Sequence, residues 1–447
     1  MNDPIDANLL DVERLTDALD DLDSVRLRRL AGRVTEVTGL VVRASIPGIR
    51  VGELVEIDTG DRRLFAEVVG FRGEEVVMMP LGTLADVGPD SLATSTGSSL
   101  EITVGHGLLG RVVDGLGRPM DGKGEIEGDT VRWSVDRAAP DPLKRKRVAE
   151  PLAMGIRAID GLLTVGEGQR IGLFAGAGVG KSTLMGQIAR NTSADVNVIC
   201  LVGERGREVS EFIEDALGEE GRARSVVVCA TSDVSSLERL KSAFVATAIA
   251  EWFREQGKRV LLMMDSLTRF ARAQREVGLA AGEPPARQGF PPSVFAMLPR
   301  LLERSGNSER GSITALYTVL VAGSDMEEPI ADEVRGILDG HIILSRELGE
   351  RNHWPAIDVL PSLSRAMHGI VSDDHRRLAS RLRTLLAAYA GKRDLIALGA
   401  YKPGTDAPTD EAIARLDRIN AFLRQSSRER TSLDETRKML VALFEAP

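Results

Sequence analysis

The spacing of apolar and polar residues changes several times along the chain, and each change predicts a different kind of element. Over residues 5–30 apolar side chains recur every three or four positions from Leu9 to Leu22, which predicts an amphipathic helix. From residue 33 to about residue 104, short β-branched runs are separated by glycine, proline and aspartate. Many short strands at close spacing predict a small barrel or sandwich.

Between residues 151 and 370, apolar runs typical of strands alternate with stretches of helical periodicity. The strand-like runs lie at 170–174, 196–202, 225–230, 260–264 and 312–321. This alternation predicts a mostly parallel sheet with helices on both faces. Residues 105–150 are glycine-rich and then basic, which is typical of a connector. We interpret the basic run KRKR at 144–147 as a solvated face of that connector and not as a nucleic-acid patch.

After about residue 375 the strand pattern stops, and helical signals take its place. One predicted helix face carries Leu416, Ile419 and Leu423. Thr409 is its expected N-cap, and Ser432 with Glu435 forms a capping-box pattern ahead of the apolar stretch 439–444. We therefore expect four segments. They are a helix (1–30), a β-barrel (31–104), an α/β domain with its connector (105–374) and a helical C-terminal domain (375–447).

Composition and charge narrow the function classes. Of the 447 residues, 43% are hydrophobic, which suits a large core and excludes a disordered chain. The net charge of −9 argues against a general nucleic-acid binder. Residues 1–100 hold 10 arginines, no lysine and 18 acidic residues, so nearly all the net charge lies in the predicted helix and barrel. That segment is expected to meet a basic protein partner.

Cysteine usage and the first residues indicate the compartment. Cys200 and Cys229 lie in apolar runs without a Cys or His at metal-ligand spacing, so two buried, reduced thiols are expected. No run reaches the roughly 18 apolar residues of a membrane span. The acidic start of the chain lacks the basic region of a signal peptide. We expect a cytoplasmic protein.

The sharpest chemical signal is AGAGVGKST at residues 175–183, which follows an apolar strand and precedes a helical segment, as a P-loop does. Its backbone N–H groups and the helix N-terminus would surround the phosphates of ATP. Lys181 would contact the β- and γ-phosphates, and Ser182 would offer its hydroxyl to Mg²⁺. Ala175 replaces the first glycine of the motif, which is harmless at negative φ. The expected nucleotide-binding residues are Gly176, Ala177, Gly178, Val179, Gly180, Lys181, Ser182 and Thr183.

Two acidic signals follow strands of the predicted sheet. Asp265 ends the run 260–264 and fits a Walker B carboxylate beside the P-loop serine and its metal. GERGRE at 203–208 follows another strand, and ligand groups gather at the carboxyl ends of such strands. Spacing alone leaves open whether Glu204 or Glu208 faces the γ-phosphate, or whether the loop forms only a solvated salt bridge.

Together these stretches resemble the catalytic subunits of the rotary and type III secretion ATPases over about residues 25–430. The most specific pieces are GERGREV, RVLLMMDSLTRFARAQRE, GEPPARQGFPPSVFA, ADEVRGILDGHI and PAIDVLPSLS. The segment GEPPARQGFPPSVFAMLPRLLERSG is closer to the secretion ATPases than to ATP synthase β. The resemblance implies an α/β fold in which a P-loop, RecA-like domain lies between a β-barrel and C-terminal helices.

The resemblance also implies roles for side chains around the P-loop. Glu204 matches the family's catalytic carboxylate, which polarises the attacking water. Arg205 matches a charge that senses the γ-phosphate, and Glu208 a carboxylate near the water shell of the metal. Arg269 lies one helical turn after Asp265 in the same active-site loop.

Three further side chains are implied by the resemblance. Arg365 matches an arginine finger that reaches the site of the adjacent subunit, whereas spacing alone makes it a surface charge. Trp354 stands where the family usually has a tyrosine that stacks on adenine, with core packing as the alternative. Tyr401 is a second candidate for the adenine pocket.

A finger supplied in trans requires a neighbour, so a homohexameric ring is expected. The resemblance implies that ATP hydrolysis releases and unfolds export cargo at the inner-membrane base of a type III secretion apparatus. It implies a stator or regulator protein at the N-terminus, and a central stalk protein and chaperone–substrate complexes at the C-terminal domain. Export-gate membrane proteins are further expected partners. The injectisome branch is favoured over the flagellar one.

Two other functions stay open. A rotary F- or V-type catalytic subunit differs in coupling, but its acidic C-terminal lever segment and the large V-type insertion are missing here. A Rho-like RNA translocase also has a barrel before its P-loop core. Barrels that bind single strands present stacking aromatics and basic grooves, however, and residues 1–100 hold only Phe65 and Phe71 as aromatics.

Overall fold

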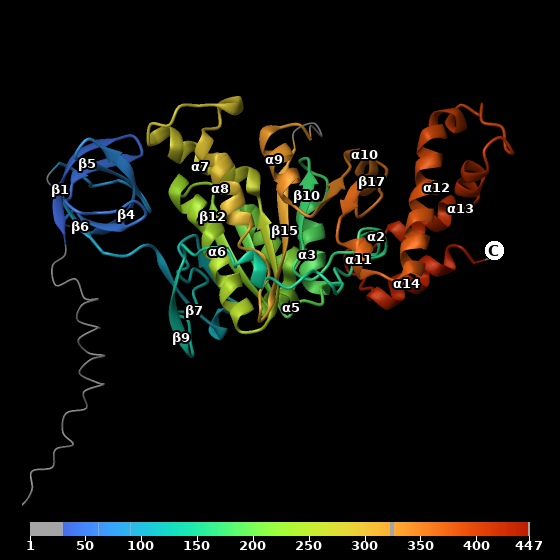
Figure 1. Cartoon of the computed structure of the whole chain (residues 1–447), viewed down its shortest axis with the longest axis horizontal. Helices are drawn as coiled ribbons and strands as arrows, with labels where there is room; N and C mark the ends of the chain where they lie inside the picture. Colours follow the sequence, from blue (N-terminus) through green and yellow to red (C-terminus); the bar gives the residue numbers. More distant parts are fainter. Residues whose placement is uncertain (1–29, 61, 90, 322–325, 446–447) are drawn as a thin grey trace, which may run out of the picture. The chain divides into compact units, whose positions relative to one another are not determined.

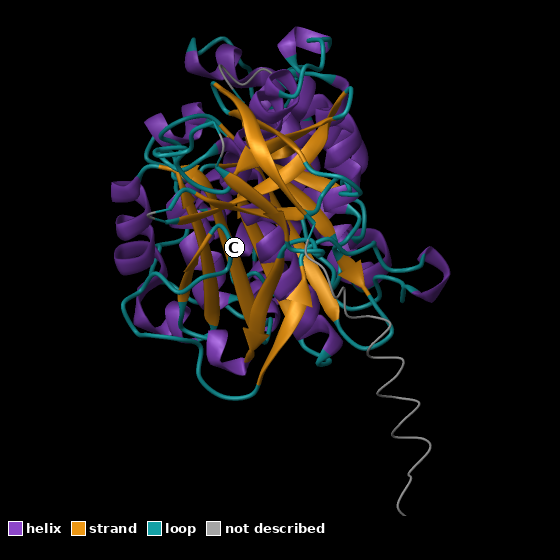
Figure 2. Ribbon diagram, turned by 90° about the vertical axis from the view of Figure 1, so that its left-hand side faces the viewer, coloured by secondary structure: helices purple, strands orange, loops and turns teal. Residues whose placement is uncertain are grey.

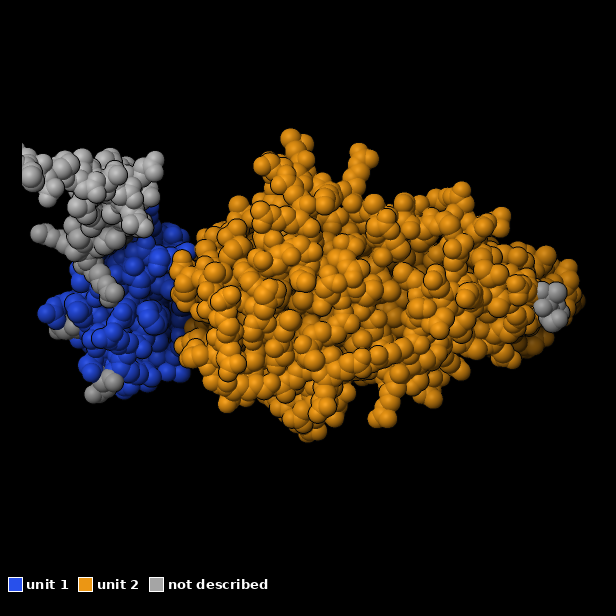
Figure 3. Space-filling view, turned by 90° about the horizontal axis from the view of Figure 1, so that it is seen from below, with its two compact units in different colours: residues 1–100 blue, residues 101–447 orange. Residues whose placement is uncertain are grey.

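The computed structural model of the chain describes residues 30–60, 62–89, 91–321 and 326–445. They fall into two compact units, residues 1–100 and 101–447 (Figure 3). Apart from its last residue, the predicted helix over 5–30 lies outside the described part of the chain.

The first unit is a closed, fully antiparallel barrel, with strand order β1-β2-β5-β4-β3-β6. Its strands are β1 (Ala31–Thr38), β2 (Val41–Ser45), β3 (Leu54–Asp58), β4 (Arg63–Arg72), β5 (Glu75–Pro80) and β6 (Leu92–Ser95). Alternate side chains fill the interior, as Val55 and Ile57 of β3 show by being fully buried. The prediction of an N-terminal barrel is confirmed (Figure 1).

The second unit is built on a sheet with the order β17-β16-β10-β15-β13-β11-β12-β8. It is parallel except for β17 and the short β14 (Gly306–Asn307), which pairs antiparallel with β15. These strands are β8 (Val112–Asp114), β10 (Arg170–Ala175), β11 (Val196–Glu204), β12 (Ser225–Thr231), β13 (Arg259–Asp265), β15 (Ser312–Leu320), β16 (Gly340–Leu344) and β17 (Ile357–Ser364). Helices lie on both sides of the sheet (Figure 2). Every residue of β11 is buried, which explains the apolar run at 198–202.

The helices of the second unit follow the predicted alternation with the strands. They are α2 (Arg157–Leu162), α3 (Lys181–Asn191), α4 (Gly206–Glu211), α5 (Gly218–Ala223), α6 (Ser236–Glu255), α7 (Leu267–Ala280), α8 (Pro292–Leu302), α9 (Pro329–Ile337), α10 (Arg346–Glu350), α11 (Met367–Ile370), α12 (Asp373–Ala397), α13 (Ala407–Leu423) and α14 (Leu433–Ala442). A π-helical turn, Phe212–Leu217, joins α4 to α5. No helix in the described ranges is both long and apolar enough to cross a membrane.

The C-terminal helices form as predicted, with one correction at a cap. Ser432 and Glu435 make the predicted capping box of α14. The N-cap of α13 is Asp406, whose side chain accepts a hydrogen bond from the backbone N–H of Thr409 at 3.3 Å. The predicted cap, Thr409, lies inside the helix because Pro408 fits the first helical turn, where its missing N–H costs nothing.

The segments on either side of the predicted barrel boundary also differ from expectation. Residues 101–104, expected in the barrel, belong to β7 (Glu101–Gly105), which pairs with β9 (Thr130–Ser134) in the second unit. Part of the expected connector forms β8, at the edge of the central sheet. In the basic run 144–147, Arg145 is half-buried and donates to the carbonyl of Ser305 at 2.8 Å, while the other three residues are exposed.

A buried ion pair joins α6 to the chain after α8. Arg304 Nε and Nη2 lie 2.9 and 2.6 Å from the two carboxylate oxygens of Glu251, and the side chains are 1% and 2% exposed. Glu251→Ala should lower the free energy of unfolding by about 3–5 kcal/mol, because it leaves a buried charge uncompensated. Urea unfolding measures this. Glu101→Ala, which removes an exposed pair with Arg132, is the control and should stay near zero; equal losses would contradict the argument.

Candidate nucleotide site

The P-loop occupies the turn between the end of β10 and the start of α3. Gly178 and Gly180 have φ values of 77° and 78°, in the left-handed region that glycine adopts without strain. A Cβ added to Gly178 would meet no atom within 4 Å, so the loop is open on that side. Ala175 belongs to β10, whose extended backbone accepts a methyl group. The alanine therefore leaves the cradle intact.

Lys181 lies between two carboxylates at the carboxyl edge of the sheet. Its ammonium forms an ion pair with Asp265 at the end of β13, and Glu204 Oε1 is 4.0 Å away. Asp265 Oδ1 also accepts a hydrogen bond from Thr318 Oγ1 at 2.8 Å. Sequence reasoning missed Thr318, because only the register of β15 beside β13 reveals that it lies next to Asp265.

Glu204 ends β11 and is enclosed by charged groups. Arg269 Nη2 lies 3.1 Å from Glu204 Oε2, and its Nη1 donates to the carbonyl of Gly203. Ser266 caps α7 by accepting from the backbone N–H of Arg269 at 3.3 Å, which fixes the start of this helix. One cation from the P-loop and one from α7 thus flank the same carboxylate.

The environment of Glu204 changes its acidity. Burial raises the pKa of Glu204 to about 7; a hydrogen bond with Glu208 and the charge of Asp265 raise it too, while Lys181 and Arg269 oppose the shift. The same hydrogen bond lowers the pKa of Glu208, whose side chain is 46% exposed. Arg205 lies 3.6 Å from Glu208 and is 78% exposed. Glu204 is therefore the enclosed member of the pair.

The raised pKa predicts a pH dependence of ATP hydrolysis. Only ionised Glu204 can accept a proton, so kcat/KM, which reports the free enzyme, should rise about tenfold from one pH unit below the pKa to one unit above it. Glu208→Gln should move the midpoint of this rise to lower pH by about one unit, because it removes the shared proton and a like charge. Steady-state rates across pH measure both. Glu211→Gln, on the exposed side of α4, should leave the midpoint unchanged, and a fixed midpoint in Glu208→Gln would contradict the coupling.

Trp354 lies against the P-loop. A Cβ added to Gly180 would lie 2.8 Å from Trp354 Cζ3, and one added to Gly349 would lie 3.0 Å from its Cη2. The indole Nε1–H donates to Asn352 Oδ1 at 3.0 Å, and the residue is 38% exposed. The ring is therefore held beside the phosphate cradle with part of its surface free.

The other two predicted residues lie elsewhere in the second unit. Tyr401 donates to the carbonyl of Asp406 at 3.2 Å and to Asp410 Oδ1 at 2.9 Å, within the turn from α12 to α13. Arg365 is exposed, and its guanidinium has no hydrogen-bond or ion-pair partner among the residues that the structure describes. It follows β17, which runs antiparallel to β16 and so away from the P-loop edge.

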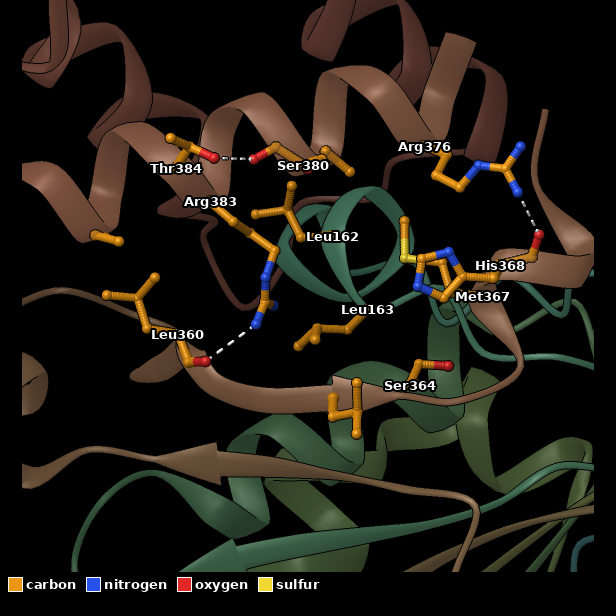
Figure 4. A pocket seen from close by; sticks show the side chains of 13 residues that line it. Leu162, Leu163, Leu360, Ser364, Met367, His368, Arg376, Ser380, Arg383 and Thr384 are labelled. Atoms are coloured by element: carbon orange, nitrogen blue, oxygen red, sulfur yellow. Dashed lines mark hydrogen bonds between the residues drawn. The ribbon is translucent and has the colours of Figure 1, made fainter. Parts of the chain in front are cut away.

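A cavity of about 440 Å³ borders β17 on the side of α12 (Figure 4). Leu162 at the end of α2, the following Leu163 and Met367 of α11 contribute much of its apolar lining. Arg383 Nη2 reaches across it to donate to the carbonyls of Leu360 and Ser362, at 3.0 and 3.1 Å. The guanidinium thus ties the strand that leads to Arg365 to the C-terminal helices.

The fold and site define a P-loop ATPase of the ATP synthase type. Residues 155–364 match the nucleotide-binding domain of the ATP synthase alpha/beta family, and residues 371–442 match the T3SS EscN ATPase C-terminal domain. The type 3 secretion system ATPase of Xanthomonas euvesicatoria is 55% identical over 95% of this chain and 96% of its own. The chain belongs to the family of type III secretion and flagellar export ATPases.

Other relatives cover both branches of that family. The flagellum-specific ATP synthase of Bacillus subtilis is 51% identical over 96% of this chain and 98% of its own. The assembled ATPase EscN of enteropathogenic E. coli has a TM-score of 0.87 at 46% identity, over 92% of this chain and 99% of its own. A second EscN structure, in complex with its central stalk EscO, has a TM-score of 0.86. The predicted family, fold class and ATPase activity are confirmed.

Proposed function

We propose that this ATPase binds Mg·ATP at residues 175–183 and hydrolyses it with Glu204 as the residue that activates water. The observation that carries the proposal is the convergence of Lys181, Asp265, Glu204 and Arg269 at one edge of the sheet. The exposed hydroxyl of Ser182 and the carboxylate of Asp265 are oxygen donors of the kind Mg²⁺ prefers. A metal held there would offset charge on the β- and γ-phosphates.

Each side chain then has one task. Lys181 exchanges its contact with Asp265 for the β- and γ-phosphate oxygens. Ionised Glu204 orients a water for in-line attack on the γ-phosphorus and takes up its proton as ADP leaves. Arg269 holds Glu204 in place, Arg205 responds to the γ-phosphate, and Glu208 tunes the acidity of Glu204.

We infer that the site is completed by Arg365 of a neighbouring copy in a homohexameric ring. β17 begins beside Leu344, near the P-loop edge, and its last residue pairs with Gly340 at the far end of β16. β16 is parallel to β10, so Arg365 lies at the opposite edge of the sheet from its own P-loop. The two edges are separated by the length of β16, about 13 Å. An exposed arginine at that place, with no partner within the described part of the chain, suits a site on another subunit.

We propose that ring hydrolysis powers protein export at the cytoplasmic face of a type III secretion apparatus. The EscN complex with EscO supports a central stalk partner. Export chaperone–substrate complexes would meet the C-terminal helices, and the N-terminal segment would dock a stator or regulator. Export-gate membrane proteins would be reached from the inner-membrane base. Trp354 would stack on adenine, with Tyr401 as a second candidate.

Complementation tests this proposal and whether the chain serves an injectisome or a flagellar export apparatus. The 55% identity to a secretion ATPase against 51% to a flagellar one favours the injectisome. Expressed in strains that lack one or the other ATPase, the chain should restore effector secretion more than motility, and Lys181→Ala should restore neither. Restored motility alone would move it to the flagellar branch. Hydrolysis that requires a second subunit type would favour a rotary ATPase instead.

A further inference from the structure

A short loop between α13 and α14, residues 424–431, is bound to the nucleotide domain. Gln425, near the start of this loop, is 4% exposed. Its backbone N–H donates to the carbonyl of Trp354 at 2.9 Å. This bond joins Trp354, which lies against the P-loop, to the loop that follows α13.

The Gln425 side chain fixes this junction to the start of α2. Its Oε1 accepts from the backbone N–H of Arg157 at 2.8 Å, and its Nε2 donates to the carbonyl of Gly155 at 2.8 Å and of Glu429 at 3.2 Å. The Arg157 side chain, itself 3% exposed, donates in return to the carbonyl of Phe422 at 2.9 Å. Both the oxygen and the nitrogen of the glutamine amide are therefore satisfied by hydrogen bonds to backbone groups.

The same loop is also bound to α3, the helix that starts with Lys181. Gln187 Nε2 donates to the carbonyl of Ser426 at 2.9 Å, and Asn191 Nδ2 to that of Glu429 at 3.1 Å. The loop thus accepts hydrogen bonds from α3 and, through the backbone N–H of Gln425, donates one to the carbonyl of Trp354.

We propose that Gln425 is a positioning residue for the nucleotide base, holding the Trp354 backbone so that the indole stays against Gly180. The inference rests on the proposed stacking role of Trp354. The indole lies between Gly180 and Gly349, where the spaces that added Cβ atoms would need are already filled. A shift of the Trp354 backbone therefore moves the indole away from Gly180. The backbone contacts of the P-loop itself stay the same.

Gln425→Met tests the proposal, because methionine keeps the length and volume of glutamine but removes the side-chain hydrogen bonds that fix the loop to Gly155 and Arg157. The backbone N–H that donates to Trp354 remains, but the loop that carries it is no longer anchored. We expect KM for Mg·ATP to rise about fivefold with kcat changed less than about twofold, since base binding is weakened and the reacting groups are untouched. The Ki of magnesium tripolyphosphate, which has the phosphates and no base, should stay the same. Equal weakening of ATP and tripolyphosphate, or an unchanged KM, would overturn the proposal.

Matched variants separate this inference from the function on which it rests. Gln274→Met replaces another glutamine that is 4% exposed, on α7, and should leave KM unchanged. Trp354→Ala should raise KM for ATP at least as much as Gln425→Met. If Trp354→Ala has no effect, the stacking role fails; if it has its effect and Gln425→Met has none, only the positioning role fails. Gln425→Asn, too short to reach both partners, gives a second measurement should the methionine variant not fold.

Discussion

Glu204→Gln is expected to lower kcat by about a thousandfold while Mg·ATP still binds. Glutamine keeps the shape of the side chain and can still contact Arg269, but it cannot take a proton from water. The P-loop and Lys181 are unchanged, so affinity for the nucleotide should fall little. Single-turnover hydrolysis and a nucleotide-binding titration on the same preparation measure the two effects separately.

The control for this variant is Glu219→Gln, an exposed glutamate on α5 beyond the active-site loop, which should keep normal turnover. Near-normal turnover in Glu204→Gln would assign the reaction to another carboxylate, and Glu208, hydrogen-bonded to Glu204, would be the first to test. Loss of nucleotide binding would show that the variant disturbed the P-loop.

Arg365→Ala is expected to lower kcat by about a thousandfold or more, because the transferring phosphoryl group loses a cation in its transition state. The loss should arise at the neighbour's site. In equal mixtures with Lys181→Ala subunits, about a quarter of the interfaces combine an intact lysine with an intact arginine. Mixing two inactive proteins should therefore restore measurable ATPase activity.

The control for the mixing experiment is Arg132→Ala, an exposed arginine on β9, which should be active alone. A series of mixing ratios should give maximal activity near equal proportions. If no ratio recovers activity although mixed rings form, Arg365 does not act across an interface, and its role would have to be sought in its own subunit.

The sequence predicted those parts of the site that depend on local order along the chain. A strand, a glycine-rich turn and a helix identify the P-loop, and an apolar run that ends in Asp265 identifies the neighbouring carboxylate. These signals are strong because each predicts the secondary-structure element and also places the side chain at the carboxyl edge of a parallel sheet. The roles of Glu204 and Arg365 needed the family resemblance, since a charged residue that follows a strand is more often a solvated surface group than a catalytic one.

Other parts could not be predicted because they depend on which distant segments meet. Thr318 contacts Asp265 only through the pairing of β15 with β13. Gln425 reaches Gly155 across most of the second unit's sequence. β8 has only Val112 and Val113 as strand signal, and its place beside β12 is set by the tertiary fold. Neither periodicity nor composition carries such information.

The antiparallel direction of β17 has a mechanical consequence for the ring. Trp354 lies just before this strand and Arg365 immediately follows it, and the two ends of the strand pair with the two ends of β16, about 13 Å apart. Both ends of β17 pair with β16, so each end is held by the same neighbouring strand. With the proposed roles, β17 positions both the Trp354 that binds a subunit's own base and the Arg365 that reaches the next subunit. Nucleotide binding at one site is therefore coupled to hydrolysis at the neighbouring site.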